Sequence, residues 1–160
     1  MDGAAPPRDP VQAGYLSGLN RAVANRPNLR LLHVIRAGQT AEADARLAGL
    51  LTGDRRIGAV CCASPRVTLK VAKILQEQGR PHGIVLIGTG LLPETLHLLR
   101  QNAVHAVTAS YPLAMGNDAL TMLADILAGR SHPSCLDSGV QIIEAKDAEG
   151  FLAEFREGGA

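Results

Sequence analysis

The tripeptide Gly88-Thr89-Gly90 comes nearest in this sequence to a nucleotide-binding motif. It follows the apolar run 83–88, which predicts a buried strand, and phosphate loops lie directly after strands. The dinucleotide fingerprint also needs a third glycine and small residues at the start of a helix, whereas Leu91-Leu92-Pro93 follows here. The tripeptide is therefore either a phosphate loop or a plain effector-contacting loop, and its composition favours the second interpretation.

The cysteines, histidines and serines do not form a pattern that binds a metal or performs catalysis. Cys61 and Cys62 are adjacent in an apolar strand-like run, so their side chains are expected on opposite faces and unpaired. No neighbouring cation would stabilise a thiolate, and Cys62 is expected to be a buried apolar filler. Ser17 lacks the strand-turn context of a nucleophile elbow, and the five histidines have no ligand spacing. We therefore expect no enzymatic activity, no metal and no cofactor.

The composition restricts the partners and the compartment. Sixteen basic and 15 acidic residues give a net charge of +1, which argues against a nucleic-acid or membrane surface in this segment. Residues 1–7 lack the cationic start and apolar run of a signal peptide, and no apolar stretch has the length of a membrane span. An odd number of cysteines without framework spacing fits a reducing compartment. The sequence thus predicts a cytoplasmic protein.

Helix-like and strand-like segments alternate along the chain after a proline-rich loop at residues 1–10. Two helix starts carry clear capping signals, Thr40 and the pair Ser64-Pro65. The alternation predicts an α/β fold with a doubly wound parallel sheet. Helices are predicted at 11–25, 41–51, 65–78, 93–100, 112–128 and 147–155, and strands at 29–35, 57–63, 83–88, 105–109 and 141–143.

Five features of the chain, in this order and with these gaps, resemble one known family. They are Ala13-Gly14-Tyr15, the run 57–63 with a helix ending in Glu77-Gln78-Gly79, the strand 84–88, the run 105–112 with Met115-Gly116, and the long helix that ends at Ala128-Gly129. Together they resemble the effector-binding domain of the lac-repressor (LacI/GalR) family of transcription regulators, over about residues 2–143. The resemblance implies the type I periplasmic-binding-protein-like fold, in which a small molecule lies between two lobes.

The same resemblance points to ligand contacts, but several polar groups that hold sugars in that family are replaced here. The family arginine before the first helix becomes Val11, the Asn-Asp pair becomes Ser64-Pro65, the loop aspartate becomes Gly90, and the hinge glutamine becomes Ser110. Because hydroxyl-rich ligands are held by charged and amide groups, the ligand is either not an ordinary sugar or is no longer bound. The expected ligand-binding residues are Val11, Tyr15, Thr40, Ser64, Arg66, Thr89, Gly90 and Ser110.

The length of the chain accounts for only one lobe of such a protein, and by resemblance this is the C-terminal lobe. We therefore expect a fragment in which residues 11–160 form the effector-binding lobe, while residues 112–160 pack on a missing lobe or on a partner. The apolar residues of the helix 112–128 would be exposed in an isolated lobe, which predicts a homodimer.

Three functions remain open at this point. The first is the domain of a LacI-family regulator that binds a small, possibly sugar-like effector and reaches DNA only through a helix-turn-helix outside this chain. The second is the soluble sugar-binding component of an ABC transporter. The third is a small nucleotide-dependent α/β enzyme.

Overall fold

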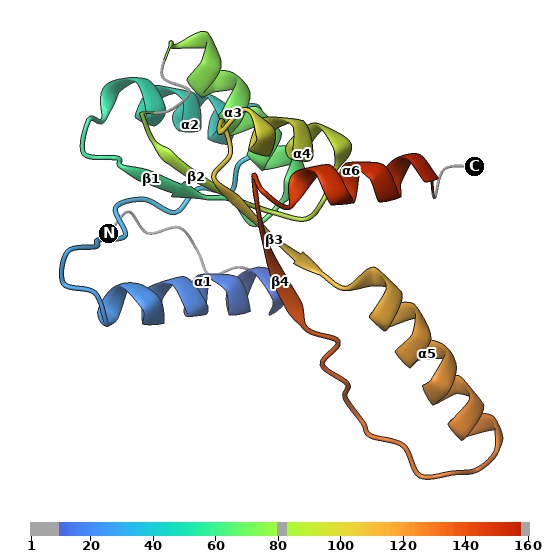
Figure 1. Ribbon diagram of the computed structural model, residues 1–160. Helices are drawn as coiled ribbons and strands as arrows, with labels where there is room; N and C mark the ends of the chain where they lie inside the picture. Colours follow the sequence, from blue (N-terminus) through green and yellow to red (C-terminus); the bar gives the residue numbers. More distant parts are fainter. Residues whose placement is uncertain (1–9, 80–82, 158–160) are drawn as a thin grey trace.

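The computed structural model describes residues 10–79 and 83–157, and within them the strands form one four-stranded sheet. The strand order follows the sequence, β1-β2-β3-β4. The strands β1, β2 and β3 are parallel, and β4 is antiparallel to β3 (Figure 1). Their bounds are β1 Ala59–Cys61, β2 Val85–Thr89, β3 Ala106–Ser110 and β4 Val140–Glu144.

The helices lie close to the predicted positions. Proline occupies the first turn of four of them, at Pro10, Pro65, Pro93 and Pro112, where its fixed φ favours the helix and its missing N–H costs nothing. Thr40 caps another, with its Oγ1 accepting a hydrogen bond from the Ala43 N–H at 3.1 Å. The helices are α1 Pro10–Ala24, α2 Ala41–Gly53, α3 Pro65–Glu77, α4 Pro93–Arg100, α5 Pro112–Leu127 and α6 Ala148–Glu157.

The expected α/β fold is confirmed, but the sheet is mixed rather than wholly parallel. The segment 128–139 returns from the far end of α5, so β4 enters the sheet edge against the direction of β3 (Figure 1). The predicted loop at residues 1–10 lies outside the described residues except for Pro10, which begins α1.

The predicted strand at residues 29–35 is wrong. This segment is extended coil that joins α1 to α2, and its side chains are half-buried from Leu31 onward. A strand requires a ladder of backbone hydrogen bonds, and the apolar run supplies only the burial. The edge strand of the sheet, β1, is only three residues long, so it has few free backbone groups with which another strand could pair.

The core lies on one face of the sheet, under α2, α3, α4 and α6 (Figure 1). Side chains alternate between the faces of each strand, and Leu86, Val107 and Ile143 point into the core with at most 1% of their surface exposed. The opposite face is only partly covered, by α1, and it leaves Val85 and Ile142 exposed.

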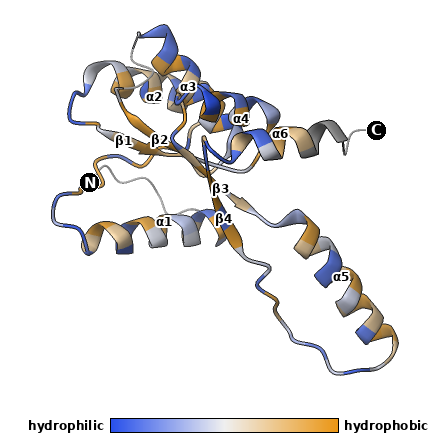
Figure 2. Cartoon of the chain, viewed as in Figure 1, coloured by the Kyte–Doolittle hydropathy of each residue, from blue (hydrophilic) through white to orange (hydrophobic). Residues whose placement is uncertain are grey.

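Helix α5 has no buried residue, which it shares with α1 and which sets it apart from the helices that cover the core. It projects from the body together with the return segment 128–139, and Figure 2 shows hydrophobic residues along it, outside the core. In the described part of the chain, no helix is long and apolar enough to cross a membrane.

Candidate ligand-binding site

The carboxyl ends of the three parallel strands meet at one edge of the sheet. The strands end at Cys61, Thr89 and Ser110, and the loops that follow carry Ser64 and Gly90. Ligands of open α/β sheets bind in the crevice outside this edge. The edge is therefore the place to look for a site.

A chain of three hydroxyl groups joins α1 to this edge. The Thr108 hydroxyl donates to the Gly88 carbonyl at 3.4 Å, and its oxygen lies 3.1 Å from Thr89 Oγ1. Thr89 in turn shares a side-chain hydrogen bond with Tyr15. The phenol of Tyr15 has one proton and two lone pairs, so beside its bond with Thr89 it keeps hydrogen-bonding capacity for a ligand.

Burial sets the charge state of Tyr15. Desolvation raises the pKa of its phenol above the usual value, and the nearby Cys61 and Cys62 add to the rise, while the hydrogen bond with Thr89 opposes it. The phenol is therefore neutral at physiological pH.

Gly90 closes the loop after β2 instead of opening it to a ligand. Its φ is +81°, and a Cβ at this position would lie 2.7 Å from Cγ of Pro65 at the start of α3. Its N–H donates to the Thr108 carbonyl at 2.7 Å. A phosphate loop presents its backbone N–H groups to the ligand, so this arrangement disfavours a nucleotide site at residues 88–90.

Thr40 and Ser64 are engaged in contacts away from the Tyr15–Thr89–Thr108 chain. The Thr40 hydroxyl is engaged in the cap of α2, and the Ser64 carbonyl accepts from the Thr68 N–H and hydroxyl, both at 3.0 Å. Three others lie at the surface: Val11 is 78% exposed, and Arg66 and Ser110 are also exposed. The structure thus places Tyr15, Thr89 and Gly90 at one edge of the sheet, and the ligand contacts of all eight residues stay predictions.

Two residues of the edge were not among those expected, Thr108 and Cys61. Thr108 pairs in register with Thr89, and Cys61 pairs with Ile87 two positions earlier on β2, so all three side chains share one face. The alternation of side chains in the strand 105–109 could have shown that Thr108 faces the same side as the strand's other outward residues. Only the register of the strands shows that it lies next to Thr89.

The cysteines behave as expected from their positions. Cys61, Cys62 and Cys135 are all free thiols. Burial raises the pKa of Cys62 to about 12, and Cys61 contributes to this rise. Such a thiol is not a nucleophile near neutral pH.

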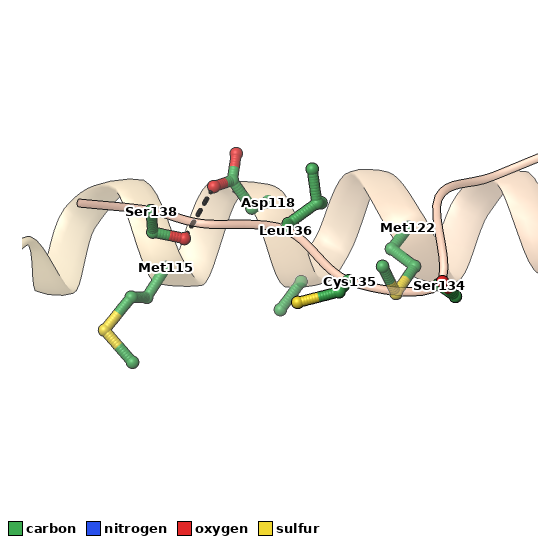
Figure 3. Close-up of a pocket in the computed structure, with 8 residues that line it drawn as sticks. Met115, Asp118, Met122, Ser134, Cys135, Leu136 and Ser138 are labelled. Carbon is green, nitrogen blue, oxygen red and sulfur yellow. Dashed lines mark hydrogen bonds between the residues drawn. The ribbon is translucent and has the colours of Figure 1, made fainter. Parts of the chain in front are cut away.

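A separate groove of about 260 Å³ lies on α5, away from the strand edge. Met115, Met122 and Asp118 line it from the helix, and Cys135 and Ser138 line it from the return segment (Figure 3). The Ser138 hydroxyl donates to Asp118 Oδ2 at 2.8 Å and fastens the segment to the helix. We assign this groove to the packing of the return segment rather than to the ligand.

The sequence matches one family model, that of the periplasmic binding protein domain, over residues 4–131. This is well over half of the chain. The chain belongs to the periplasmic binding protein domain family. No curated protein matches it in a sequence search.

The fold of this periplasmic binding protein domain is similar to about half of several longer chains of known structure. GanP, a glucose-galactose binding protein from Geobacillus stearothermophilus, is 25% identical, with a TM-score of 0.73 over 82% of this chain and 48% of that one. The arabinose transporter component from Shewanella sp. ANA-3 is 18% identical, with a TM-score of 0.75 over 90% and 49%. A protein from Mycobacterium smegmatis is 16% identical, with a TM-score of 0.75 over 98% and 52%. The chain spans about half the length of these structures.

We expect Tyr15→Phe to lower the free energy of unfolding of this periplasmic binding protein domain by about 0.5–1.5 kcal/mol, because the hydrogen bond to Thr89 is lost. The difference in phenolate absorbance between the wild type and the variant reports on Tyr15 alone. The midpoint of its pH titration should lie above ~10, the ordinary pKa of tyrosine. Because desolvation raises the pKa of Tyr15 in the folded protein, the wild type should have its full stability below the ordinary tyrosine pKa and lose stability relative to the variant as the pH rises through the folded pKa.

Tyr111→Phe, at an exposed tyrosine, is the matched control and should change stability by less than about 0.5 kcal/mol. A Tyr15 absorbance step at or below the ordinary pH would contradict the docking of α1 on the sheet.

Proposed function

We propose that this domain is the C-terminal lobe of a two-lobe receptor for a small molecule. The observation that carries the proposal is the hydroxyl chain Tyr15–Thr89–Thr108 at the carboxyl edge of the parallel strands. The half-length similarity to two sugar-binding proteins supports the same idea, since a second lobe would complete the crevice.

The ligand we propose is a small, neutral molecule, a sugar derivative with fewer hydroxyls than a simple hexose. The hydroxyl chain offers the phenol of Tyr15 as a neutral hydrogen-bonding group near the thiol of Cys61. Hydroxyl-rich ligands need paired hydrogen bonds from charged and amide groups, and the residues at Val11, Gly90 and Ser110 do not supply them.

The role we favour is that of a cytoplasmic effector-binding domain in a LacI/GalR-type transcription regulator. Its support is the order of the five sequence features that end with the helix α5 and Ala128-Gly129. Effector binding would shift the populations of two lobe arrangements, and so the spacing of helix-turn-helix domains carried elsewhere on the protein.

A second candidate is the soluble sugar-binding component of an ABC transporter. It is supported by GanP, whose name specifies glucose and galactose, and by the arabinose transporter component from Shewanella. The coding sequence upstream separates the two roles: a helix-turn-helix supports the regulator, and a signal peptide supports the transporter component.

We expect the chain to bind glucose, galactose and arabinose weakly or not at all. Each charged hydrogen bond missing at Val11 or Gly90 removes about 1.5–3 kcal/mol of binding free energy, and the neutral amide bond missing at Ser110 removes about 0.5–1.5 kcal/mol. Calorimetric titration of the three sugars tests this, with 6-deoxy and O-methyl derivatives as the comparison set. Micromolar affinity for any one of the three parent sugars would contradict the proposed ligand class. If no member of either set binds, the proposed ligand class is wrong. If one binds and Thr89→Val leaves its affinity unchanged, the strand edge is not the site.

A further inference from the structure

The edge of the sheet at β1 has backbone groups that no strand pairs. The Gly58 carbonyl accepts a hydrogen bond from β2 at 2.9 Å, and the Cys62 N–H donates to Ile87 of β2 at 2.8 Å. Backbone groups of successive strand residues point to opposite edges, so those of Ala59 and Cys61 point away from β2. Because β1 is the first strand in the sheet order, these groups lie at an open edge within the described part of the chain.

The extended segment 30–35 runs beside this edge in the direction of β1. Within it, His33 Nε2 lies 3.2 Å from Oδ2 of Asp54, which precedes β1. Beyond its end, a Cβ at Gly38 would lie 3.5 Å from Cγ2 of Val67, on the helix that follows β1. The backbone groups of this segment pair with no other backbone group among the residues that the structure describes. Two parallel stretches of chain thus lie next to each other, and neither supplies a hydrogen-bonding partner for the other.

The helices show where a further strand belongs. Helices α2, α3 and α4 cover one face of the sheet, and α1 lies on the other (Figure 1). Connections between parallel strands are almost always right-handed, so those that cross the sheet in opposite directions place their helices on opposite faces. The connections through α2, α3 and α4 all run from the segment 30–35 toward β3. The connection through α1 ends at this segment on the other face, so the strand that leads into α1 must lie on the β1 side of the segment.

We propose that a strand from the rest of the two-lobe receptor inserts between the segment 30–35 and β1, parallel to both, and leads into α1. The inference rests on the proposed function in one respect, that this domain is part of a larger receptor. The sequence predicts a proline-rich loop at residues 1–10, so the inserted strand lies ahead of this loop. Its hydrogen-bonding partners are the free N–H and C=O groups of Ala59, Cys61 and the segment 30–35.

The surroundings of this position select an apolar strand and link it to the candidate site. On the core face the strand meets Val60, which packs against the core, and Cys62, which is 3% exposed. On the other face it meets α1, and a strand covered on both faces is an apolar run. Its carboxyl end lies beside Cys61, where α1 and α3 leave neighbouring strands on opposite faces. Open α/β sheets bind ligands at such a switch point, so the inserted strand completes the site next to Tyr15.

The first experiment measures amide hydrogen exchange by NMR on the whole chain, with and without a test strand fused ahead of residue 1. The test strand is a run of about six valines and isoleucines behind a pair of lysines. In the chain alone, the N–H groups of Ala59 and Cys61 should exchange at least about 10-fold faster than those of Val60 and Cys62. The test strand should slow exchange at Ala59 and Cys61 by at least about 10-fold. Equal exchange of the two pairs in the chain alone, or no slowing by the test strand, overturns the proposal.

Ala59→Pro and Val60→Pro form a matched pair that tests which backbone groups face the open edge. Ala59→Pro removes an N–H directed away from β2, so the chain alone should keep its midpoint of urea unfolding. Val60→Pro removes an N–H directed to β2 and should lower the midpoint. In the fused chain, Ala59→Pro should abolish the slowing of exchange at Cys61. An equal loss of stability from both prolines, or slowing that survives Ala59→Pro, overturns the proposal.

Disulfide formation with Cys61 tests the direction of pairing, in a background with Cys135→Ser. A cysteine near the carboxyl end of the test strand, on the face of α1, should link to Cys61, and a cysteine near its amino end should not. The converse result means antiparallel pairing and overturns the proposal. None of these measurements needs a ligand. Strand pairing without binding of any sugar derivative therefore contradicts only the proposed ligand class, whereas sugar binding without strand pairing contradicts only this inference.

Discussion

Gly90→Asp is expected to lower the free energy of unfolding by about 2–5 kcal/mol. The substitution installs the carboxylate that LacI/GalR-type loops carry at this position. The left-handed φ of +81° costs a residue with a Cβ roughly 1–2 kcal/mol. The Cβ would also lie 2.7 Å from Cγ of Pro65, and overpacking of this kind costs about 1–3 kcal/mol more.

Urea unfolding of Gly90→Asp and of Gly79→Asp separates the two causes. Gly79 also has a left-handed φ, of +65°, but a Cβ there meets nothing within 4 Å. The Gly79 variant should therefore lose about 1–2 kcal/mol, from the backbone alone. If both variants lose the same amount, the contact between Gly90 and Pro65 is not tight. If Gly90→Asp keeps wild-type stability and gains sugar binding, the loop after β2 is open to ligand and our account of it is wrong.

Helix positions were well predicted because their signals are local. Pro65, Pro93 and Pro112 sit at the first turns of α3, α4 and α5, as their missing N–H and fixed φ require. Thr40 caps α2 through its own hydroxyl. Such signals act within one helical turn, so the sequence around each position is enough to predict where a helix begins.

Strand pairing was predicted less well because it depends on partners far away in the chain. The apolar run 29–35 has the composition of a strand but joins no ladder, and the antiparallel direction of β4 follows from the return segment 128–139. An apolar run reports burial, and it does not report which edge is free or from which side the chain arrives.

The site residues also divide into those that the sequence predicts and those that depend on contacts between distant segments. Tyr15 and Thr89 were expected as ligand residues from the family resemblance, and the structure joins them by a hydrogen bond. Thr108 was missed because its place beside Thr89 is set by the register of β2 and β3. The contact of Gly90 with Pro65 was also beyond the sequence, since it depends on how closely α3 approaches the sheet.

Gly88→Ala is expected to lower the free energy of unfolding by about 1–3 kcal/mol, although alanine is the smallest possible addition. Gly88 is buried in β2, where α3 packs closest to the strand. A Cβ there would lie 2.7 Å from Cγ2 and 2.9 Å from Oγ1 of Thr68, and 3.0 Å from Cγ1 of Val107. Thr68 cannot turn away freely, because its hydroxyl donates to the Ser64 carbonyl at 3.0 Å.

A double-mutant cycle with Thr68→Ser identifies the contact that causes this loss. Serine keeps the hydroxyl that bonds Ser64 but removes Cγ2, so the double variant should recover about 0.5–2 kcal/mol relative to the sum of the single changes. Gly58→Ala is the matched control: a Cβ there meets nothing within 4 Å, and its effect on the midpoint of urea unfolding should be near zero. Strictly additive single effects would mean that the methyl group of Thr68 does not limit this position. The glycine would then be required by the hydroxyl oxygen of Thr68, which serine keeps, or by Val107 on β3.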